Sequence, residues 1–259
     1  MHFMPKRATI EFSRAISPQY RLPLPFVEFE EVVPGVRFGR PDQLLTPAYW
    51  ALRCQTANLD EIDFVNRHGS LADEIGFCLL GGFGVTLEVA TAFFERLQSA
   101  GVFSDSSQVS EAELLSLLME PAIVKGRPHR YRFPNQRARR IHAAMRQLTL
   151  MDLDPKDPVG FRDAVQSLEG VGPKTASWIV RNWLDVDMIA ILDIHVLRAG
   201  WAMNLFARDC RLPKDYLVLE NRFIEFSERL NLRASVLDSV IWSDMRRFGS
   251  SLAQERLIA

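Results

Sequence analysis

The chain has 259 residues, enough for one large domain or for two small ones that share a cleft. Its 31 Lys and Arg residues nearly balance 32 Asp and Glu residues, and the net charge of -1 excludes a protein that binds polyanions through total charge alone. No apolar run reaches the roughly 18 residues needed to span a bilayer, and the start lacks the apolar region of a secretory signal. We therefore expect a cytoplasmic protein without a membrane partner.

The cysteines Cys54, Cys78 and Cys210 are odd in number and far apart, and no CxxC pair is present. This usage argues against a disulfide scaffold, and against a site in which four cysteines hold zinc or an iron–sulfur cluster. We therefore expect a reducing compartment, no metal and no cofactor.

The first seventy residues differ from the rest of the chain because they are rich in proline. Prolines at this density block long helices, and the alternation of Val or Phe with Glu in residues 26–33 is typical of a short extended stretch. We expect residues 1–70 to form an extended segment that packs with a C-terminal lobe, with a helix near residues 47–58.

From residue 71 onward, apolar residues recur at three- and four-residue spacing, which predicts helices. The run Gly81-Gly82-Phe83-Gly84 is poor helix interior, so we expect two helices joined by a sharp bend there. Ser110 and Glu113 have the spacing of a capping box at the start of another helix. Further helices are predicted over residues 134–150, 213–230 and 234–248, so the expected fold class is all-α.

The best-defined unit is a helix–hairpin–helix. Asp157 caps its first helix, Gly170 ends that helix, and Pro173 opens the second helix after the turn at Gly172. The two glycines let the backbone approach a ligand closely, and the unpaired N–H groups of the second helix favour an anion such as a nucleic-acid phosphate. The alternative is a GxG turn that only joins two packed helices.

Lys174 and Asp193 are the candidate reactive groups. Lys174 lies in the first turn of its helix, where the dipole disfavours an ammonium, and a neutral amine is a nucleophile. It could equally be a solvated surface lysine or a phosphate contact. Asp193 ends an apolar run and could face an active site, cap the helix that starts at Ile194, or do both. His195 could contact a phosphate or be structural.

Residues 168–198, LEGVGPKTASWIVRNWLDVDMIAILDIHVLR, resemble the signature of the helix–hairpin–helix DNA glycosylases. The hairpin lysine, its spacing to the aspartate and the sequence Ala-Ile-Leu-Asp-x-His are similar to those of the 8-oxoguanine DNA glycosylases, most of all to their shorter second family from archaea and bacteria. Residues 131–141 and 76–80 resemble two further blocks of this family.

The resemblance implies two helical lobes with the helix–hairpin–helix at the cleft between them. A helical barrel would cover residues 71–184, and residues 185–259 would form a C-terminal lobe with the N-terminal segment. The implied function is base-excision repair: a monomeric DNA glycosylase with AP lyase activity that removes 8-oxoguanine from double-stranded DNA beside the nucleoid of a prokaryotic cell. Lys174 would attack C1′ and hold the sugar as a Schiff base, while Asp193 would stabilise positive charge developing on the sugar.

The resemblance also implies contacts to the DNA backbone from residues near the hairpin: Gly170, Gly172, Thr175 and His195. Seven basic residues and no acidic residue lie between positions 125 and 142, which is a local polyanion footprint in a neutral chain. From this run we expect Arg132, Arg137 and Arg140 to contact DNA, although a charge run can also be only a solvated face.

An enzyme that works on a base must extrude it and hold it between flat or apolar groups. Trp178 lies four residues after Lys174, on the same helix face, where its ring could cover the base or pack in the core. Trp242 or Phe248 could cover the other side of the base. Phe83 could act as an apolar wedge in the duplex.

The chain departs from the family pattern at two places. Relatives often carry Asn or Gln where this chain has the glycine-rich bend, and Ala259 replaces the lysine with which some members end. Two alternatives remain open. One is a glycosylase of the same architecture that acts on another lesion or lacks lyase activity; the other is a non-catalytic DNA-binding module that keeps only the hairpin.

Overall fold

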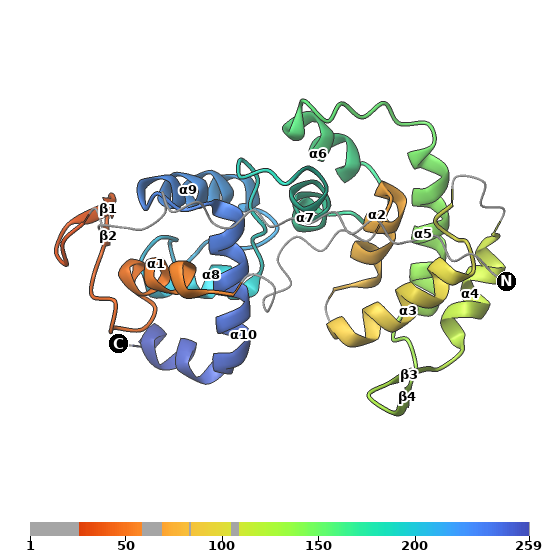
Figure 1. Ribbon diagram of the computed structural model, residues 1–259, viewed down its shortest axis with the longest axis horizontal. Helices are drawn as coiled ribbons and strands as arrows, with labels where there is room; N and C mark the ends of the chain where they lie inside the picture. Colours follow the sequence, from red (N-terminus) through yellow and green to blue (C-terminus); the bar gives the residue numbers. More distant parts are fainter. Residues whose placement is uncertain (1–25, 59–68, 83, 105–108, 259) are drawn as a thin grey trace, which may run out of the picture.

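The computed structural model describes residues 26–58, 69–82, 84–104 and 109–258, and for residues 249–258 it describes the backbone alone. Within these ranges the chain forms ten helices and two short β-hairpins (Figure 1). The predicted all-α fold class is therefore confirmed.

In chain order the elements are β1 (Glu31–Val33), β2 (Val36–Arg37), α1 (Pro47–Thr56), α2 (Leu71–Leu80), α3 (Leu87–Ser99), α4 (Glu111–Met119), β3 (Ala122–Val124), β4 (Arg127–His129), α5 (Pro134–Leu148), α6 (Pro158–Gln166), α7 (Pro173–Leu184), α8 (Ile194–Ala202), α9 (Tyr216–Arg229) and α10 (Ala234–Ile258).

One lobe consists of α2 to α6 and the β3–β4 hairpin, packed around buried apolar residues between positions 75 and 189. Helix α2 ends at Leu80 and α3 begins at Leu87, so the bend expected between two helices is present. The capping box of Ser110 and Glu113 at the start of α4 is also present. Asp157 caps α6 by accepting a hydrogen bond from the backbone N–H of Gly160, as the sequence predicts.

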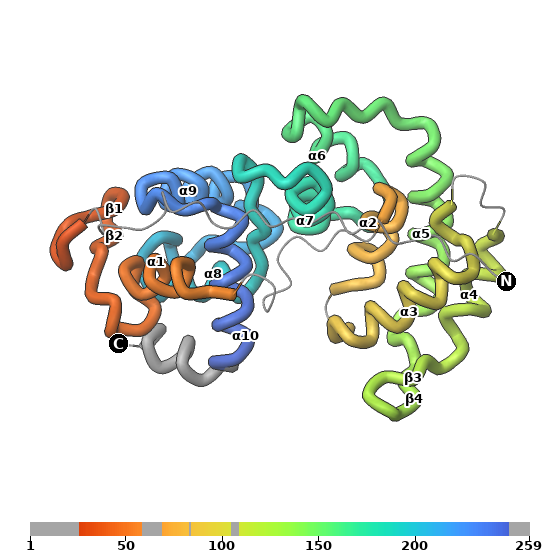
Figure 2. Tube along the Cα trace, viewed as in Figure 1, coloured from red at the N-terminus to blue at the C-terminus, as the bar shows by residue number. Residues whose placement is uncertain are grey.

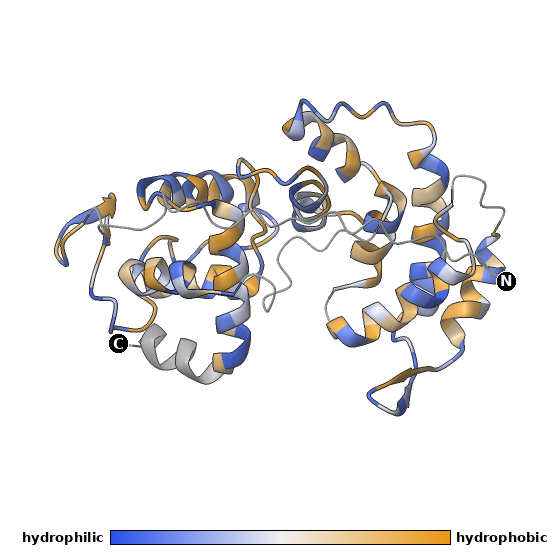
Figure 3. Cartoon of the chain, viewed as in Figure 1, coloured by the Kyte–Doolittle hydropathy of each residue, from blue (hydrophilic) through white to orange (hydrophobic). Residues whose placement is uncertain are grey.

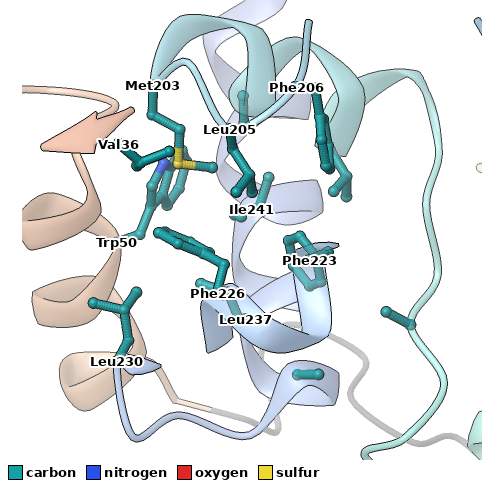
Figure 4. Packing of buried hydrophobic residues seen from close by; sticks show 14 of the residues in the cluster. Val36, Trp50, Met203, Leu205, Phe206, Phe223, Phe226, Leu230, Leu237 and Ile241 are labelled. Atoms are coloured by element: carbon teal, nitrogen blue, oxygen red, sulfur yellow. The ribbon is translucent and has the colours of Figure 1, made fainter. Parts of the chain in front are cut away.

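The other lobe combines the two ends of the described chain. Residues between 32 and 54 and between 190 and 245 share one cluster of buried apolar side chains. Trp50 of α1 and Val36 of β2 lie among Met203, Phe226 and Leu230 in the close view (Figure 4). Burial of these side chains holds β1, β2 and α1 against α8, α9 and α10.

Helix α7 lies between the two lobes (Figures 1 and 2). It contacts α2 and α6 on one side and α9 on the other. The chain crosses from one buried cluster to the other between Ile189 and Ala190. As a result, the residues that follow this crossing stand beside α7.

The β3–β4 hairpin is an element that the sequence analysis missed. Its two-residue turn has positive φ at both positions, 51° at Lys125 and 76° at Gly126, which is the geometry of a type I′ turn. Lys-Gly is a weaker signal for this turn than Asn-Gly. The hairpin joins an apolar strand to a strongly polar one and projects from its lobe (Figure 3).

Helix boundaries otherwise differ little from those expected, except at α6, which ends at Gln166 before the expected end at Gly170, and at α10. This helix continues to Ile258, ten residues beyond the predicted end at 248, although Gly249, Ser250 and Ser251 are weak helix formers. Among the helices of the described residues, none combines the length and apolarity that crossing a lipid bilayer requires.

Candidate active site

A cleft of about 1670 Å³ opens between the two lobes. Its walls come from α2, α3 and the β3–β4 hairpin on one side and from α8 and α10 on the other, and α7 contributes Lys174 and Trp178. The segment 191–193, residues 211–213 and Tyr216 of α9 also line it. The cleft is therefore formed by parts of the chain that are far apart in sequence, and both candidate reactive groups lie in it.

Lys174 occupies the first turn of α7 and is partly buried in the cleft. Its Nζ lies 5.5 Å from the centre of the Trp178 ring. Among the described residues it forms no ion pair with a carboxylate, unlike Lys125, whose Nζ is 2.9 Å from Glu88 Oε1. The amine is thus accessible to a ligand in the cleft without first breaking a salt bridge.

Asp193 performs both of the roles that the sequence left open. Its Oδ1 accepts hydrogen bonds from the backbone N–H of His195 at 2.8 Å and of Val196 at 3.1 Å, which caps α8. The side chain also lines the cleft, although the residue is only 8% exposed. These two N–H donors fix the carboxylate in place, and Oδ2 has no hydrogen-bond donor among the described residues.

His195 lies in the cleft, partly buried, one residue into the first turn of α8. Burial lowers the pKa of the imidazole below its ordinary value of 6.5. Asp193 opposes this shift, and the nearby cations of Arg198, Lys174 and Arg246 add to it. Of these charged groups, Asp193, Lys174 and Arg246 line the same cleft as His195. The imidazole is accordingly neutral at pH 7.

The fold requires glycine at only one of the two hairpin positions. Gly170 has φ +89°, and a Cβ at that position would stand 2.4 Å from Arg140 Cδ, so the fold itself requires glycine there. Gly172 has φ -94°, which any residue can adopt, and a Cβ there would meet nothing within 4 Å. Gly172 therefore leaves open, accessible space in front of the start of α7. Thr175 follows in the same first turn, partly buried and outside the cleft lining.

Of the aromatic candidates, Trp178 and Trp242 line the cleft. Trp178 also packs edge-on against Phe77, with ring centres 6.1 Å apart, so stacking and packing are both available to it. Phe248 lies outside the lining and packs against the core of the second lobe, which corrects its assignment to the cleft. Six residues separate it from Trp242, which places it on another face of α10. Phe83 lies outside the described residues.

The three arginines chosen from the basic run lie in different surroundings. Arg137 is 9% exposed and donates from Nη2 to the carbonyl of Gly81 at 2.9 Å. It holds the end of α2, so its expected role in contacting DNA is corrected to an internal one. Arg140 is partly buried against Gly170. Arg132 is exposed, with its guanidinium 5.0 Å from the centre of the Phe133 ring.

Arg246 is a cleft residue that the sequence analysis missed. Its guanidinium lies 5.0 Å from the centre of the Trp242 ring. The spacing of four residues from Trp242 on one helix was the available signal. Trp178 and Trp242 are thus each accompanied by a cation from their own helix, four residues away.

Two helical lobes, a helix–hairpin–helix at their junction and a lysine and an aspartate in one cleft define the class of helix–hairpin–helix DNA glycosylases. A family model described as 8-oxoguanine DNA glycosylase matches residues 55–232. Because this match covers more than half of the chain, the chain belongs to the 8-oxoguanine DNA glycosylase family.

The individual relatives match the chain only in part and at low identity. The 8-oxoguanine DNA glycosylase/AP lyase of Methanocaldococcus jannaschii is 32% identical over 120 residues, which cover 43% of this chain and 56% of that protein. The chain thus spans about half the length of the curated relatives it matches.

Two solved structures from the same organism share the fold. The crystal structure of its 8-oxoguanine DNA glycosylase has a TM-score of 0.51 at 24% identity and covers 78% of this chain and 88% of the other. The glycosylase/lyase in complex with 15mer DNA containing 8-oxoguanine has a TM-score of 0.50 at 23% identity, covering 78% and 91%.

Proposed function

We propose that this chain is a DNA glycosylase with AP lyase activity that excises 8-oxoguanine from double-stranded DNA through a Schiff base on Lys174. The observation that carries the proposal is the pair of reactive groups in one cleft. Lys174 has no carboxylate partner among the described residues, and the Asp193 carboxylate is fixed by two backbone N–H donors in the same lining.

In the proposed reaction, the Lys174 ammonium first loses a proton to solvent, and the uncharged Nζ then attacks C1′ of the damaged nucleotide. The bond from C1′ to the base breaks, its electron pair leaves with the base, and a proton from the amine goes to the departing base or to solvent. The ring C1′–O4′ bond then opens to give the Schiff base. Loss of a C2′ proton breaks the bond to the 3′ phosphate by β-elimination, and water hydrolyses the imine to restore Lys174.

Asp193 would act electrostatically in this sequence. Positive charge develops on the sugar as the bond to the base breaks, and a fixed carboxylate stabilises that charge more than it stabilises the ground state. The cap on α8 supports this role because it holds the carboxylate before substrate arrives.

The hairpin would bind the DNA backbone. The start of α7 carries no side-chain cap, so its N–H groups are available to an anion, and Gly172 leaves space for a phosphate to approach them. Gly170 would shape this turn. Thr175 at the same helix start and His195 across the cleft are further candidates for phosphate contacts, which position a nucleic acid without reading its sequence.

The extruded base would enter the cleft beside Trp178 or Trp242. Both rings line it, and an aromatic ring in the lining offers the flat surface on which an extruded base stacks. Arg132 and Arg140 remain candidates for contacts to the DNA backbone, together with the polar β3–β4 hairpin. We propose that the chain acts on duplex DNA as a monomer.

The test is a duplex with a single 8-oxoguanine, incubated with the protein with and without borohydride. We expect strand cleavage, and a reduced covalent adduct when borohydride is present. Lys174→Gln should abolish both while lesion-DNA binding is retained. Lys214→Gln, which removes an exposed lysine outside the cleft lining, should behave like the wild type.

Three outcomes would each overturn a part of this proposal. Base release without an adduct in the wild type would reject the Schiff-base route and indicate a monofunctional glycosylase. Cleavage of duplexes that carry uracil, hypoxanthine or thymine glycol in preference to 8-oxoguanine would reject the substrate. Normal cleavage by Lys174→Gln would reject the catalytic assignment.

A further inference from the structure

Two buried carboxylates join the part of the chain that carries Lys174 to the part that carries Asp193. Glu220 of α9 accepts hydrogen bonds from Arg162 Nη1 of α6 at 2.6 Å and from the Ser177 hydroxyl of α7 at 3.2 Å. The same carboxylate accepts a third hydrogen bond from the backbone N–H of Ala190 at 3.1 Å. Glu220 therefore connects both helices of the helix–hairpin–helix to residues 190–192, the crossing segment, in which the chain passes from the first lobe to the second.

Asp238 of α10 repeats this arrangement one residue further along. Its Oδ1 accepts from Arg181 Nη2 of α7 at 2.8 Å, and its Oδ2 accepts from the backbone N–H of Ile191 at 2.8 Å. One carboxylate oxygen thus binds the lysine-bearing helix and the other binds the segment that leads to the aspartate. Glu220 and Asp238 are both 2% exposed.

Tyr216 of α9 holds the remaining backbone groups of this segment. Its hydroxyl accepts a hydrogen bond from the N–H of Leu192 at 3.1 Å and donates to the carbonyl of Ala190 at 2.8 Å. All three N–H groups of residues 190–192 are therefore bound by side chains of the second lobe. Asp193 follows immediately, so its position is set by side chains that also fix α7.

We propose that Glu220 and Asp238 are positioning residues that set the distance between the Lys174 amine and the Asp193 carboxylate. This inference rests on the proposed function. Glu220 lies outside the cleft lining, and Asp238 lines the cleft with its two oxygens bound to Arg181 and to the Ile191 N–H. Each therefore acts by joining residues 190–192 to the helices of the hairpin. A displacement of about 1 Å between reacting groups can cost about 10²-fold in rate, so small shifts in this network would lower turnover.

The experiment compares Asp238→Asn and Glu220→Gln with Asp244→Asn. Asp244 is also on α10, is 5% exposed and pairs with Arg53 of α1 at 2.6 Å, outside the crossing segment. Asp244→Asn therefore removes a buried charge, and with it some stability, while the hydrogen bonds between α7 and residues 190–192 stay intact. Melting temperature, single-turnover excision from an 8-oxoguanine duplex and Kd for that duplex are measured for each variant.

We expect Asp238→Asn and Glu220→Gln to lower the single-turnover rate by about tenfold to 10²-fold with Kd within about threefold of the wild type. Asp244→Asn should lose a comparable amount of thermal stability and keep the wild-type rate. If all three variants excise at the same rate, the two carboxylates contribute only stability and the inference is wrong.

Breaking a buried ion pair can prevent folding. Tyr216→Phe provides the milder test, because it releases the Leu192 N–H and the Ala190 carbonyl and leaves both ion pairs intact. A slower rate at unchanged Kd supports the inference, and an unchanged rate overturns it. If the wild type itself releases no 8-oxoguanine, the proposed function is wrong. If the wild type is active and the variants are equally active, only the positioning role is wrong.

Discussion

Lys174 and Trp178 stand one turn apart on α7, with the Lys174 Nζ 5.5 Å from the centre of the Trp178 ring. The amine proposed to attack the sugar and the ring proposed to stack on the base are therefore carried by successive turns of one helix. A base on Trp178 would bring its own C1′ near Lys174. This relationship links substrate binding and chemistry in a single element.

Replacing the ring should therefore reduce reaction with the lesion. Stacking of a base on an aromatic side chain is worth about 1–3 kcal/mol, so Trp178→Leu should lower kcat/KM for an 8-oxoguanine duplex by roughly five- to 150-fold. Steady-state cleavage measures the effect. Trp183→Leu is the control, since Trp183 is on the same helix, partly buried, and absent from the cleft lining. Equal losses in both variants would assign Trp178 to core packing alone.

Alanine at the two hairpin glycines should have different effects, on stability at Gly170 and on DNA binding at Gly172. Gly170→Ala places a side chain at φ +89° and against Arg140, so it should lower the free energy of unfolding by at least about 1–2 kcal/mol. Gly172→Ala meets no atom within 4 Å and should leave the melting temperature unchanged. It should nevertheless weaken binding of duplex DNA, because its methyl group occupies the approach of the phosphate. Unchanged Kd in Gly172→Ala would argue that the turn only joins two helices.

Local signals made the helix–hairpin–helix predictable. Asp157 and Pro173 each mark a helix start through their own backbone chemistry, and the lysine and aspartate are placed by short spacings along the chain. The expected end at Gly170 was wrong, because α6 already ends at Gln166. The attachment of residues 190–192 to α9 and α10 was not predictable in this way. It joins groups more than twenty residues apart, and nothing in a local pattern indicates which buried carboxylate meets which N–H.

For the basic run, residues 125–142, the sequence predicted a DNA contact at Arg137 that the structure does not support. Its seven like charges suggested a continuous DNA-binding surface, although α5 turns successive residues to different sides. Arg137 shares a face with Ile141 and Ala144, both fully buried, so the helical period already indicated that Arg137 points inward. Counting charge along the chain concealed this periodicity.

Substitution of Arg137 should consequently lower stability, whereas substitution of Arg132 should alter DNA binding. Arg137→Gln removes the donor to the Gly81 carbonyl and should lower the free energy of unfolding by about 1–3 kcal/mol, measured by urea denaturation. Arg132→Gln alters an exposed side chain and should leave stability unchanged. If Arg132 contacts a phosphate, its loss should reduce the salt dependence of DNA binding by about one unit in slope. An unchanged slope would remove Arg132 from the interface.

His195 should make the stability of the protein fall in mildly acidic solution. Burial lowers the pKa of its imidazole in the folded state below 6.5, whereas the unfolded chain has the ordinary value. Between these two values the unfolded state binds a proton that the folded state does not, so the free energy of unfolding decreases as the pH falls through this window. Above pH 6.5 both states carry a neutral imidazole and the effect is absent.

Urea denaturation of the wild type and His195→Gln, at pH values on either side of 6.5, measures this contribution. The wild type should lose more stability than His195→Gln as the pH is lowered, because the variant lacks the titrating group. His129→Gln removes an exposed histidine of β4 and should follow the wild type. Parallel pH profiles for the wild type and His195→Gln would show that the imidazole titrates alike in the folded and unfolded chains. That result would contradict the burial of His195 among the cations of the cleft.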